Sequence, residues 1–295
     1  MTLVFVPTDG LGNLLFQHNA AYSFAKENNL ELCAPGWYYD RFPKFGEYAK
    51  LFKHVKILGE ESDGGGRSGL NGGSSAQHIF HPPQEFFMDP ERWRILNALR
   101  FSPVKNVYVE RGHTYKPIPK DARVISGYFQ SWKYFDKFRI EIRDLLFANE
   151  TELHDLKKEK HATLSEGKPT VCVHIRRGDY AKNPTIHPMC DQEYYTKAIN
   201  EFSGKYKFLV FAENIEEIRK WNVWSDLDVH FVDDEPLPLD TLFLMALCHN
   251  FIIANSSLSL MAYYMRQNED ARLIFPKDWF GPGGPRFNIE DIVKT

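Results

Sequence analysis

Cysteine is scarce in this chain of 295 residues, and its cysteines stand far apart. They are Cys33, Cys172, Cys190 and Cys248, and no two of them form a C-x-x-C pair. This spacing argues against a zinc site and against a disulfide framework. We therefore expect four reduced thiols, as in a protein of a reducing compartment.

Long apolar runs are absent as well. No stretch approaches the roughly 18 apolar residues of a transmembrane helix, so we expect no integral membrane segment. The first residues carry no basic cluster and reach Asp9 too early for a signal peptide. The sequence thus predicts a cytoplasmic protein, whose association with a membrane would be peripheral at most.

Neither sign of charge dominates, because 36 lysines and arginines stand against 39 aspartates and glutamates. A formal net charge of −3 argues against nucleic acid or an anionic membrane as the main partner. An anionic ligand must therefore be bound by a local cluster of a few groups.

The second half of the chain alternates short apolar runs with helical patterns. We expect strands at 170–175, 207–213, 229–232, 251–254 and 272–275, and helices at 191–202, 214–221, 237–249 and 256–267. Asn214 and Glu217 have the spacing of a capping box at the start of one helix. This alternation is typical of a parallel sheet in a Rossmann-like domain.

The first half begins in the same way, with a strand at 3–6, a glycine turn and a helix at 13–28. A further strand is expected at 124–126 and a further helix at 133–147, and residues 62–75 form a flexible glycine- and serine-rich loop. The charged stretch 157–168 is interpreted as the boundary between an N-terminal domain, 1–160, and a C-terminal domain, 168–295.

Two adjacent arginines, Arg176 and Arg177, directly follow the buried strand at 170–175. Ligands of parallel sheets bind at the carboxyl ends of the strands. A guanidinium group matches phosphate oxygens with two parallel hydrogen bonds and stays charged at any working pH. The pair therefore indicates an anion site, and the alternative from the residues alone is a structural network of arginine and carboxylate groups.

Polar residues follow two further strands at the same edge. Asn255, Ser256 and Ser257 precede a helix, where hydroxyl and free N–H groups either bind an anion or cap the helix. Asp240 lies at the start of another helix. Its carboxylate can accept two hydrogens from a guanine edge, or it is a favourable charge at a helix N-terminus.

Gly10 and Gly12 follow the first strand and resemble the start of a dinucleotide-binding fingerprint. Leu15 stands where the third glycine would be, so an NAD(P)-dependent oxidoreductase is a weak alternative. The glycines instead allow a backbone to approach a sugar or a phosphate, beside Asn13.

Four stretches together resemble the α-1,2-fucosyltransferases of glycosyltransferase family 11. They are Gly10-Leu-Gly-Asn-Leu-Leu-Phe-Gln17, Gly127-Tyr-Phe-Gln130, His174-Ile-Arg-Arg-Gly-Asp-Tyr180 and Ala254-Asn-Ser-Ser-Leu-Ser259. They occur in the order found in the family and, with their neighbours, extend to Ala262. The resemblance implies an α/β fold of two Rossmann-like domains that face each other across a cleft, the B-type glycosyltransferase architecture.

The resemblance also implies roles for the residues. The donor would be GDP-fucose, a substrate rather than a cofactor, and no metal would be needed. The implied donor-binding residues are His174, Arg176, Arg177, Asp240, Asn255, Ser256, Ser257, Gly12 and Asn13. Among them, Arg176 would bind the pyrophosphate, Ser256 and Ser257 the β-phosphate and Asp240 the guanine, while Asn13 would face the fucose.

The expected reaction is an inverting transfer of L-fucose from GDP to a hydroxyl of an acceptor glycan, at O2 of a terminal galactoside. The alternatives are a fucosyltransferase of other linkage and a catalytically silent protein that binds glycans or nucleotide sugars. The sequence identifies neither the acceptor nor the oligomeric state.

The catalytic base is expected to be Asp179, three residues after Arg176. The alternatives are His187, Asp191 and Glu213, or no protein base, with a phosphate oxygen accepting the proton. Asp179 would otherwise orient one of the arginines through an ion pair.

Overall fold

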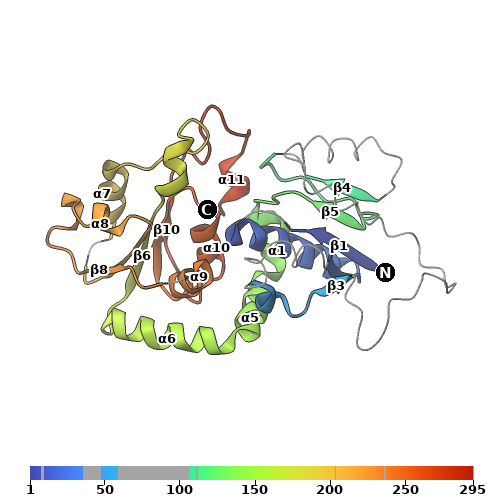
Figure 1. Ribbon diagram of the computed structural model, residues 1–295, viewed down its shortest axis with the longest axis horizontal. Coiled ribbons are helices and arrows are strands. Elements are labelled where there is room, and N and C mark those ends of the chain that lie inside the picture. The colour runs from blue at the N-terminus through green and yellow to red at the C-terminus, as the bar shows by residue number, and fades with distance from the viewer. Residues whose placement is uncertain are drawn as a thin grey trace, which may run out of the picture.

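The computed structural model describes residues 1–7, 10–35, 48–58, 106–110, 112–202, 204–235 and 237–294. The expected glycine-rich loop at 62–75 lies outside these residues. The described chain forms an α/β fold with two five-stranded sheets, one on each side of helices α1 (Leu11–Glu27) and α10 (Ser257–Tyr264) (Figure 1). Among the described residues no helix is both long and apolar enough to cross a membrane.

The first sheet has the strand order β3-β2-β1-β5-β4, and every pair in it is parallel. Its strands are β1 (Thr2–Val6), β2 (Glu31–Pro35), β3 (Lys56–Leu58), β4 (Val107–Val109) and β5 (Val124–Ser126). The predicted strands at 3–6 and 124–126 are confirmed, and α1 begins two residues earlier than predicted.

The predicted helix at 133–147 is wrong at its beginning. Two 3-10 turns, Trp132–Tyr134 and Asp136–Phe138, precede α5 (Arg139–Asn149). Between these turns Phe135 leaves the helical conformation, at φ −136°, and its ring is buried against Phe16 and Tyr264. Burial of this aromatic ring therefore overrides the local helical pattern.

The second sheet has the order β10-β9-β6-β7-β8 and is also parallel throughout. Its strands are β6 (Thr170–Ile175), β7 (Lys207–Ala212), β8 (Val229–Val232), β9 (Asn250–Ile252) and β10 (Leu273–Ile274). The helices between them are α7 (Gln192–Asn200), α8 (Ile215–Ile218), α9 (Pro238–Ala246) and α10. Each predicted strand and helix of this half is confirmed in type, and the helices are shorter than predicted.

The capping box predicted at Asn214 is wrong. The Asn214 side chain makes no capping hydrogen bond, and α8 has only four residues. The turn is closed by the backbone instead, because the Glu217 N–H donates to the Asn214 carbonyl at 3.1 Å.

Most of the predicted boundary stretch 157–168 is helical. It belongs to α6 (Thr151–Ser165), which ends at Glu166 and Gly167 in the left-handed region, at φ 51° and 74°. The two sheets do lie on either side of α6 in the sequence. They nevertheless share one buried core, which runs from Phe5 on β1 to Met261 on α10.

Helices α1 and α10 touch where neither has a bulky side chain. A methyl group on Gly12 would lie 2.4 Å from the Leu258 backbone nitrogen and 2.6 Å from Ser257 Oγ. Gly12 is therefore needed for the close approach of two backbones from different halves of the chain.

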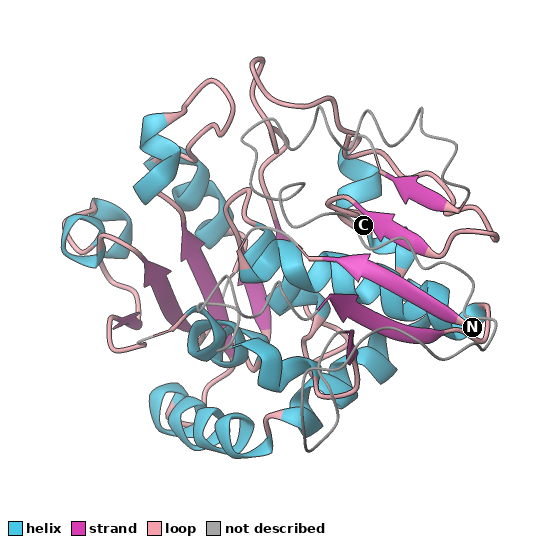
Figure 2. Ribbon diagram, turned by 45° about the vertical axis from the view of Figure 1, so that its right-hand side comes forward, coloured by secondary structure: helices cyan, strands magenta, loops and turns pink. Residues whose placement is uncertain are grey.

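The last described residues return to the first half (Figure 2). Helix α11 (Ile289–Ile292) accepts a hydrogen bond from Trp132 Nε1 at the Glu290 carbonyl, 2.8 Å away. Lys133 pairs with Asp291 of the same helix. The chain thus connects its halves twice, once through α5 and α6 and once through α11.

Candidate active site

The carboxyl ends of β6, β7 and β9 meet at one edge of the second sheet, because these strands are adjacent and parallel. Ile175 on β6 pairs with Ala212 on β7, and the Ala254 N–H donates to the His174 carbonyl at 3.1 Å. This register brings together Arg176, Glu213 and the serines before α10. It is the edge at which parallel sheets bind ligands.

Arg176 lies between two carboxylates. Its guanidinium contacts Asp179 Oδ1 at 2.7 Å and Glu213 Oε1 at 2.5 Å, and it lies over the Tyr180 ring at 5.3 Å. Gly178 leaves the space for this arrangement, since a methyl group there would lie 1.9 Å from Glu213 Oε2. Arg176 is therefore pre-oriented at the strand end, and its side chain remains 27% exposed.

Asp179 is the more exposed of the two carboxylates, at 63% of its side-chain surface. The ion pair between Asp179 and Arg176 favours a role in orienting the arginine. The exposure of Asp179 favours a role as the base, because a base must reach the acceptor. Of the other base candidates, His187 stacks on Tyr180 at 4.5 Å. Asp191 caps α7 by accepting from the Tyr194 N–H at 2.8 Å. The assignment of the base stays a prediction.

His174 is buried behind Arg176. Its Nδ1 lies 2.9 Å from Ser259 Oγ on α10. Burial, together with the charge of Arg176, lowers the pKa of His174 to about 3, so the ring is neutral at physiological pH. The structure thus has His174 supporting α10.

Arg177 diverges from Arg176. Its guanidinium lies over the Trp221 ring at 5.1 Å, and Nη1 lies 3.7 Å from Met189 Sδ. Successive side chains at a strand end point to opposite faces, so two adjacent arginines rarely serve one ligand. The structure does not bring Arg177 into the cluster around Arg176.

The residues before α10 lie against this cluster. The Tyr180 hydroxyl donates to the Asn255 carbonyl at 2.9 Å, and Asn255 Nδ2 donates to the Trp279 carbonyl at 3.0 Å. Ser256 has the extended backbone of an N-cap, but its side chain makes no capping hydrogen bond. The Ser256 hydroxyl is thus not used by the helix, as the anion-binding interpretation requires.

Asp240, on α9, forms an ion pair with a lysine of another helix, α6. Its carboxylate contacts Lys157 on α6 at 2.8 Å, and Lys157 also contacts Glu235 at 2.5 Å. Lys160 extends this network to Glu235 at 2.7 Å and to Asp234 at 2.6 Å. The guanine-binding role of Asp240 stays a prediction, since the structure shows this carboxylate in an ion pair.

From the first half, Asn13 and Gly12 reach the same region through α1. Gln130 Nε2 donates to Asn13 Oδ1 at 2.6 Å, which joins the 127–130 stretch to the start of α1. Gly12 lies against Ser257 and Leu258. The close approach at Gly12 is thus made by the backbone of α10 in this structure.

The sequence pattern of Glycosyl transferase family 11 matches residues 104–280, which is more than half of the chain. The chain belongs to this family. The matched range includes Arg176, Glu213, and Ser256 and Ser257 at the start of α10, while Gly12 and Asn13 lie outside it.

Named relatives are 25–31% identical to this chain over matched stretches of 159 to 250 residues. The O-antigen biosynthesis glycosyltransferase WbnK of Escherichia coli is 31% identical over 179 residues, 55% of this chain and 56% of WbnK. Galactoside alpha-(1,2)-fucosyltransferase 2 of Sus scrofa is 26% identical over 245 residues, 77% of this chain and 67% of that enzyme. The fucosyltransferase NodZ from Bradyrhizobium has a TM-score of 0.49 at 16% identity, over 97% of this chain and 98% of NodZ. The match to WbnK spans about half of that relative's length.

Sequence reasoning missed Glu110, which determines the shape of the family 11 stretch Gly127–Gln130. The buried Glu110 carboxyl accepts a hydrogen bond from the Phe129 N–H, and the Tyr134 hydroxyl donates to it at 3.3 Å. Phe129 has a φ of 50° and Gly127 a φ of 148°. A methyl group on Gly127 would overlap the Glu110 side chain. Burial raises the pKa of Glu110 to about 7. A single glutamate after a short strand gives no local sequence signal.

Sequence reasoning also passed over the Asp226-Leu227-Asp228 tripeptide, a spacing that suits a metal. Asp228 contacts Lys168 at 2.6 Å and Lys207 at 3.0 Å, and its carbonyl accepts from the Phe208 N–H near the start of β7. This is the sheet edge opposite to Arg176. Among the described residues no group of three or more histidine, cysteine or acidic side chains is arranged to hold a metal ion.

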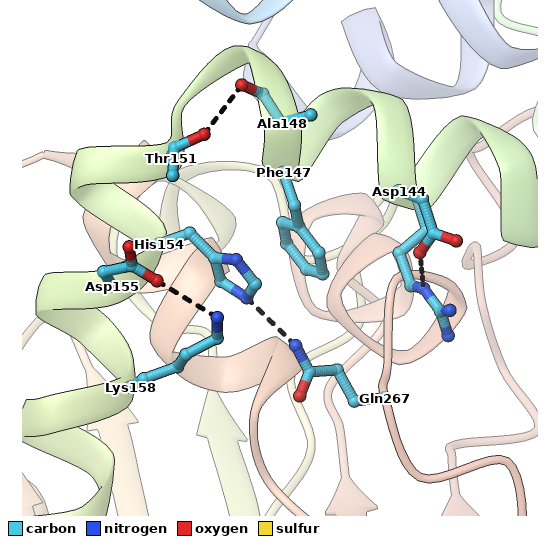
Figure 3. Close-up of a pocket in the computed structure, with 9 residues that line it drawn as sticks. Asp144, Phe147, Ala148, Thr151, His154, Asp155, Lys158 and Gln267 are labelled. Atoms are coloured by element: carbon cyan, nitrogen blue, oxygen red, sulfur yellow. Dashed lines mark hydrogen bonds and ion pairs between the residues drawn. The ribbon is translucent and has the colours of Figure 1, made fainter.

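A separate hollow of about 440 Å³ lies beside the junction of α5 and α6 (Figure 3). Its polar side chains pair with one another, because Gln267 contacts His154 at 3.0 Å and Lys158 contacts Asp155 at 3.1 Å. None of the residues at the carboxyl edge lines it. We assign it no ligand.

Proposed function

We propose that this family 11 protein is an inverting glycosyltransferase that moves L-fucose from GDP-fucose to O2 of a terminal galactoside. The observation that carries the proposal is the position of Arg176 beside the start of α10, at the carboxyl edge of a parallel sheet. The name of the Sus scrofa relative supports an α-1,2 linkage to a galactoside. In this proposal the substrates bind between the two sheets.

Arg176 and α10 would bind the diphosphate. The guanidinium donates a hydrogen bond to Asp179 and forms an ion pair with Glu213, and phosphate oxygens have the charge to replace both carboxylates. When the bond between fucose and the β-phosphate breaks, negative charge develops on the phosphate oxygens. Arg176 and the positive end of α10 stabilise that charge, so we propose that no divalent metal is required.

Asp179 would take the proton of the acceptor hydroxyl. Once the diphosphate replaces Asp179 at Arg176, this exposed carboxylate is released at the site of the reaction. The acceptor oxygen attacks the anomeric carbon from the side opposite GDP, and its proton passes to Asp179 as the new bond forms.

The transfer is tested with the purified protein, GDP-fucose and a series of β-galactosides, with and without EDTA. We expect a fucosylated product whose linkage by NMR is α-1,2, at the same rate in both buffers. A relative named Alpha-1,2-colitosyltransferase makes a colitosyl donor a useful second arm. Binding of donor without turnover would instead show a silent binding protein, and loss of activity in EDTA that Mg²⁺ restores would refute the metal-free site.

The role of Asp179 is tested with Asp179→Asn, by measuring GDP affinity and the single-turnover rate separately. Loss of a base leaves GDP binding near normal and slows the chemical step by ~10²–10⁴-fold. If GDP affinity falls in step with the rate, Asp179 orients Arg176 and is not the base.

A further inference from the structure

Five buried polar atoms at or near the carboxyl edge of the second sheet have no hydrogen-bond partner among the described residues. They are Arg177 Nε, which lies on the Trp221 side, and His113 Nδ1, Gln130 Oε1, His187 Nδ1 and Asn255 Oδ1. Such atoms are costly to bury without a partner, so several in one region indicate a ligand that supplies the missing hydrogen bonds. The amide oxygen of Asn255 is clearly an acceptor, because its Nδ2 donates to the Trp279 carbonyl.

Aromatic rings connect these residues across the two halves. His113, which follows β4, stacks on Tyr128 at 5.2 Å and contacts the Phe280 ring at 4.6 Å. His187 also contacts Phe280, with the ring centroids 5.9 Å apart, and His187 stacks on Tyr180. Because Arg176 lies over Tyr180, this layer of rings leads from the first half of the chain to the predicted diphosphate site.

The layer carries polar groups but little charge. Burial lowers the pKa of His113 to about 4, and burial also lowers the pKa of His187. Both imidazoles are therefore neutral at physiological pH, and each offers one donor and one acceptor nitrogen. The amide oxygens of Gln130 and Asn255 add two acceptors.

This combination fits an uncharged sugar. Aromatic faces pack against the C–H faces of a pyranose ring, and a few well-placed polar groups fix its orientation. Unpaired acceptors require a ligand with several O–H donors. A charged ligand would gain no opposite charge from the imidazoles and amides.

We infer that His113, Gln130 and His187, with the Phe280 ring that contacts both histidines, form the subsite for a neutral acceptor sugar. This inference rests on the proposed function, because it names the part of the same site that binds the second substrate. It places binding of that sugar on residues from both halves of the chain.

The test compares His113→Phe and His187→Phe, which keep an aromatic ring and remove the ring nitrogens. Loss of one hydrogen bond to a neutral group costs about 1 kcal/mol and of two about 2 kcal/mol, so we expect the acceptor KM to rise about 5- to 30-fold. The donor KM and the affinity for GDP should stay within about twofold of wild type. His230→Phe on β8 is the matched control and should change neither substrate constant.

Unchanged acceptor KM in both variants would overturn the inference, as would an equal rise in the donor constants. If His113→Phe fails to fold by circular dichroism, Gln130→Met of similar shape replaces it with the same expectation.

Failure of the proposed function is recognised separately. If the wild-type protein transfers no sugar, binding of free β-galactosides is followed by saturation-transfer NMR. Binding that is lost in His113→Phe supports the subsite, and absence of binding by the wild type overturns it.

Discussion

At the scale of single residues, the Arg176 guanidinium donates a hydrogen bond to Asp179 and forms an ion pair with Glu213. A lysine keeps the charge but cannot donate from a planar fork to two acceptors. We expect Arg176→Lys to lose about 100-fold or more in kcat/KM, close to the loss in Arg176→Ala, because charged hydrogen bonds contribute about 1.5–3 kcal/mol each.

The control is Arg219→Lys, at an arginine that lies over Phe231 at 4.6 Å and pairs with Asp233. It should retain normal turnover. An Arg176→Lys enzyme with near-normal kcat/KM would show that the diphosphate is bound elsewhere.

Glu110 makes stability depend on pH. Its folded-state pKa of about 7 lies above the ordinary value of 4.5 because the carboxyl is buried. Between these two values the folded state binds more protons than the unfolded state, so the contribution of Glu110 to stability falls as pH rises. Glu110→Gln removes this dependence and can still accept from the Phe129 N–H.

We therefore expect the unfolding free energy of Glu110→Gln, relative to wild type, to rise by roughly 2 kcal/mol from pH 5 to pH 7 and then to level off. Urea titrations at a series of pH values measure this difference. A difference that is constant with pH would show that Glu110 is ionised in the folded protein throughout this range.

At the scale of elements, the contact between α1 and α10 depends on Gly12. A side chain at this position meets backbone atoms, which cannot rotate away as a flexible side chain can. We expect Gly12→Ala to lower the unfolding free energy by roughly 1–3 kcal/mol, as overpacking does in other cores. The midpoint of urea unfolding measures it.

Gly10→Ala is a closely matched control, because a methyl group on Gly10 has no atom within 4 Å and its φ is −75°. It should leave the midpoint nearly unchanged. Equal effects of the two substitutions would mean that the loss comes from the glycine turn and not from the α1–α10 contact.

The elements that sequence patterns predicted well are the buried parallel strands. The side chains of Thr170–Ile175, for example, are all buried, and most of them are apolar, so the ends of this strand can be predicted from the sequence. The site residues that directly follow those strands, Arg176 and Ser256, were placed together for the same reason. The conformation of Phe135 was misjudged because a distant aromatic contact decides it, and the helix α6 was missed because its charged stretch was interpreted as a domain boundary.

At the scale of the whole molecule, one large buried cluster includes side chains of both sheets, such as Phe5 and Phe251, and the division into two domains stays a prediction. A common core couples the unfolding of its parts. We therefore expect a single calorimetric transition, with equal calorimetric and van't Hoff enthalpies. Two resolved transitions would show that the halves unfold independently and that the shared core contributes little.

Contacts between residues far apart in the sequence leave no local pattern in it. Gln130 binds Asn13 from 117 positions away, and His113 lies in a backbone bridge with Phe287. Such pairs can be identified only when the positions of the sheets and helices are known. For this reason the sequence predicted the donor side of the candidate site and missed His113 and Glu110.

The backbone contact at Gly12 has a thermodynamic consequence for the affinities of the two proposed substrates. Ser257 belongs to the predicted phosphate site, and α1 carries Asn13 toward the sugar, so one rigid contact joins the two ends of the reaction. If GDP shifts α10, α1 must follow, and the affinity for the acceptor changes. Linkage is reciprocal, so a bound acceptor must change the affinity for GDP by the same factor.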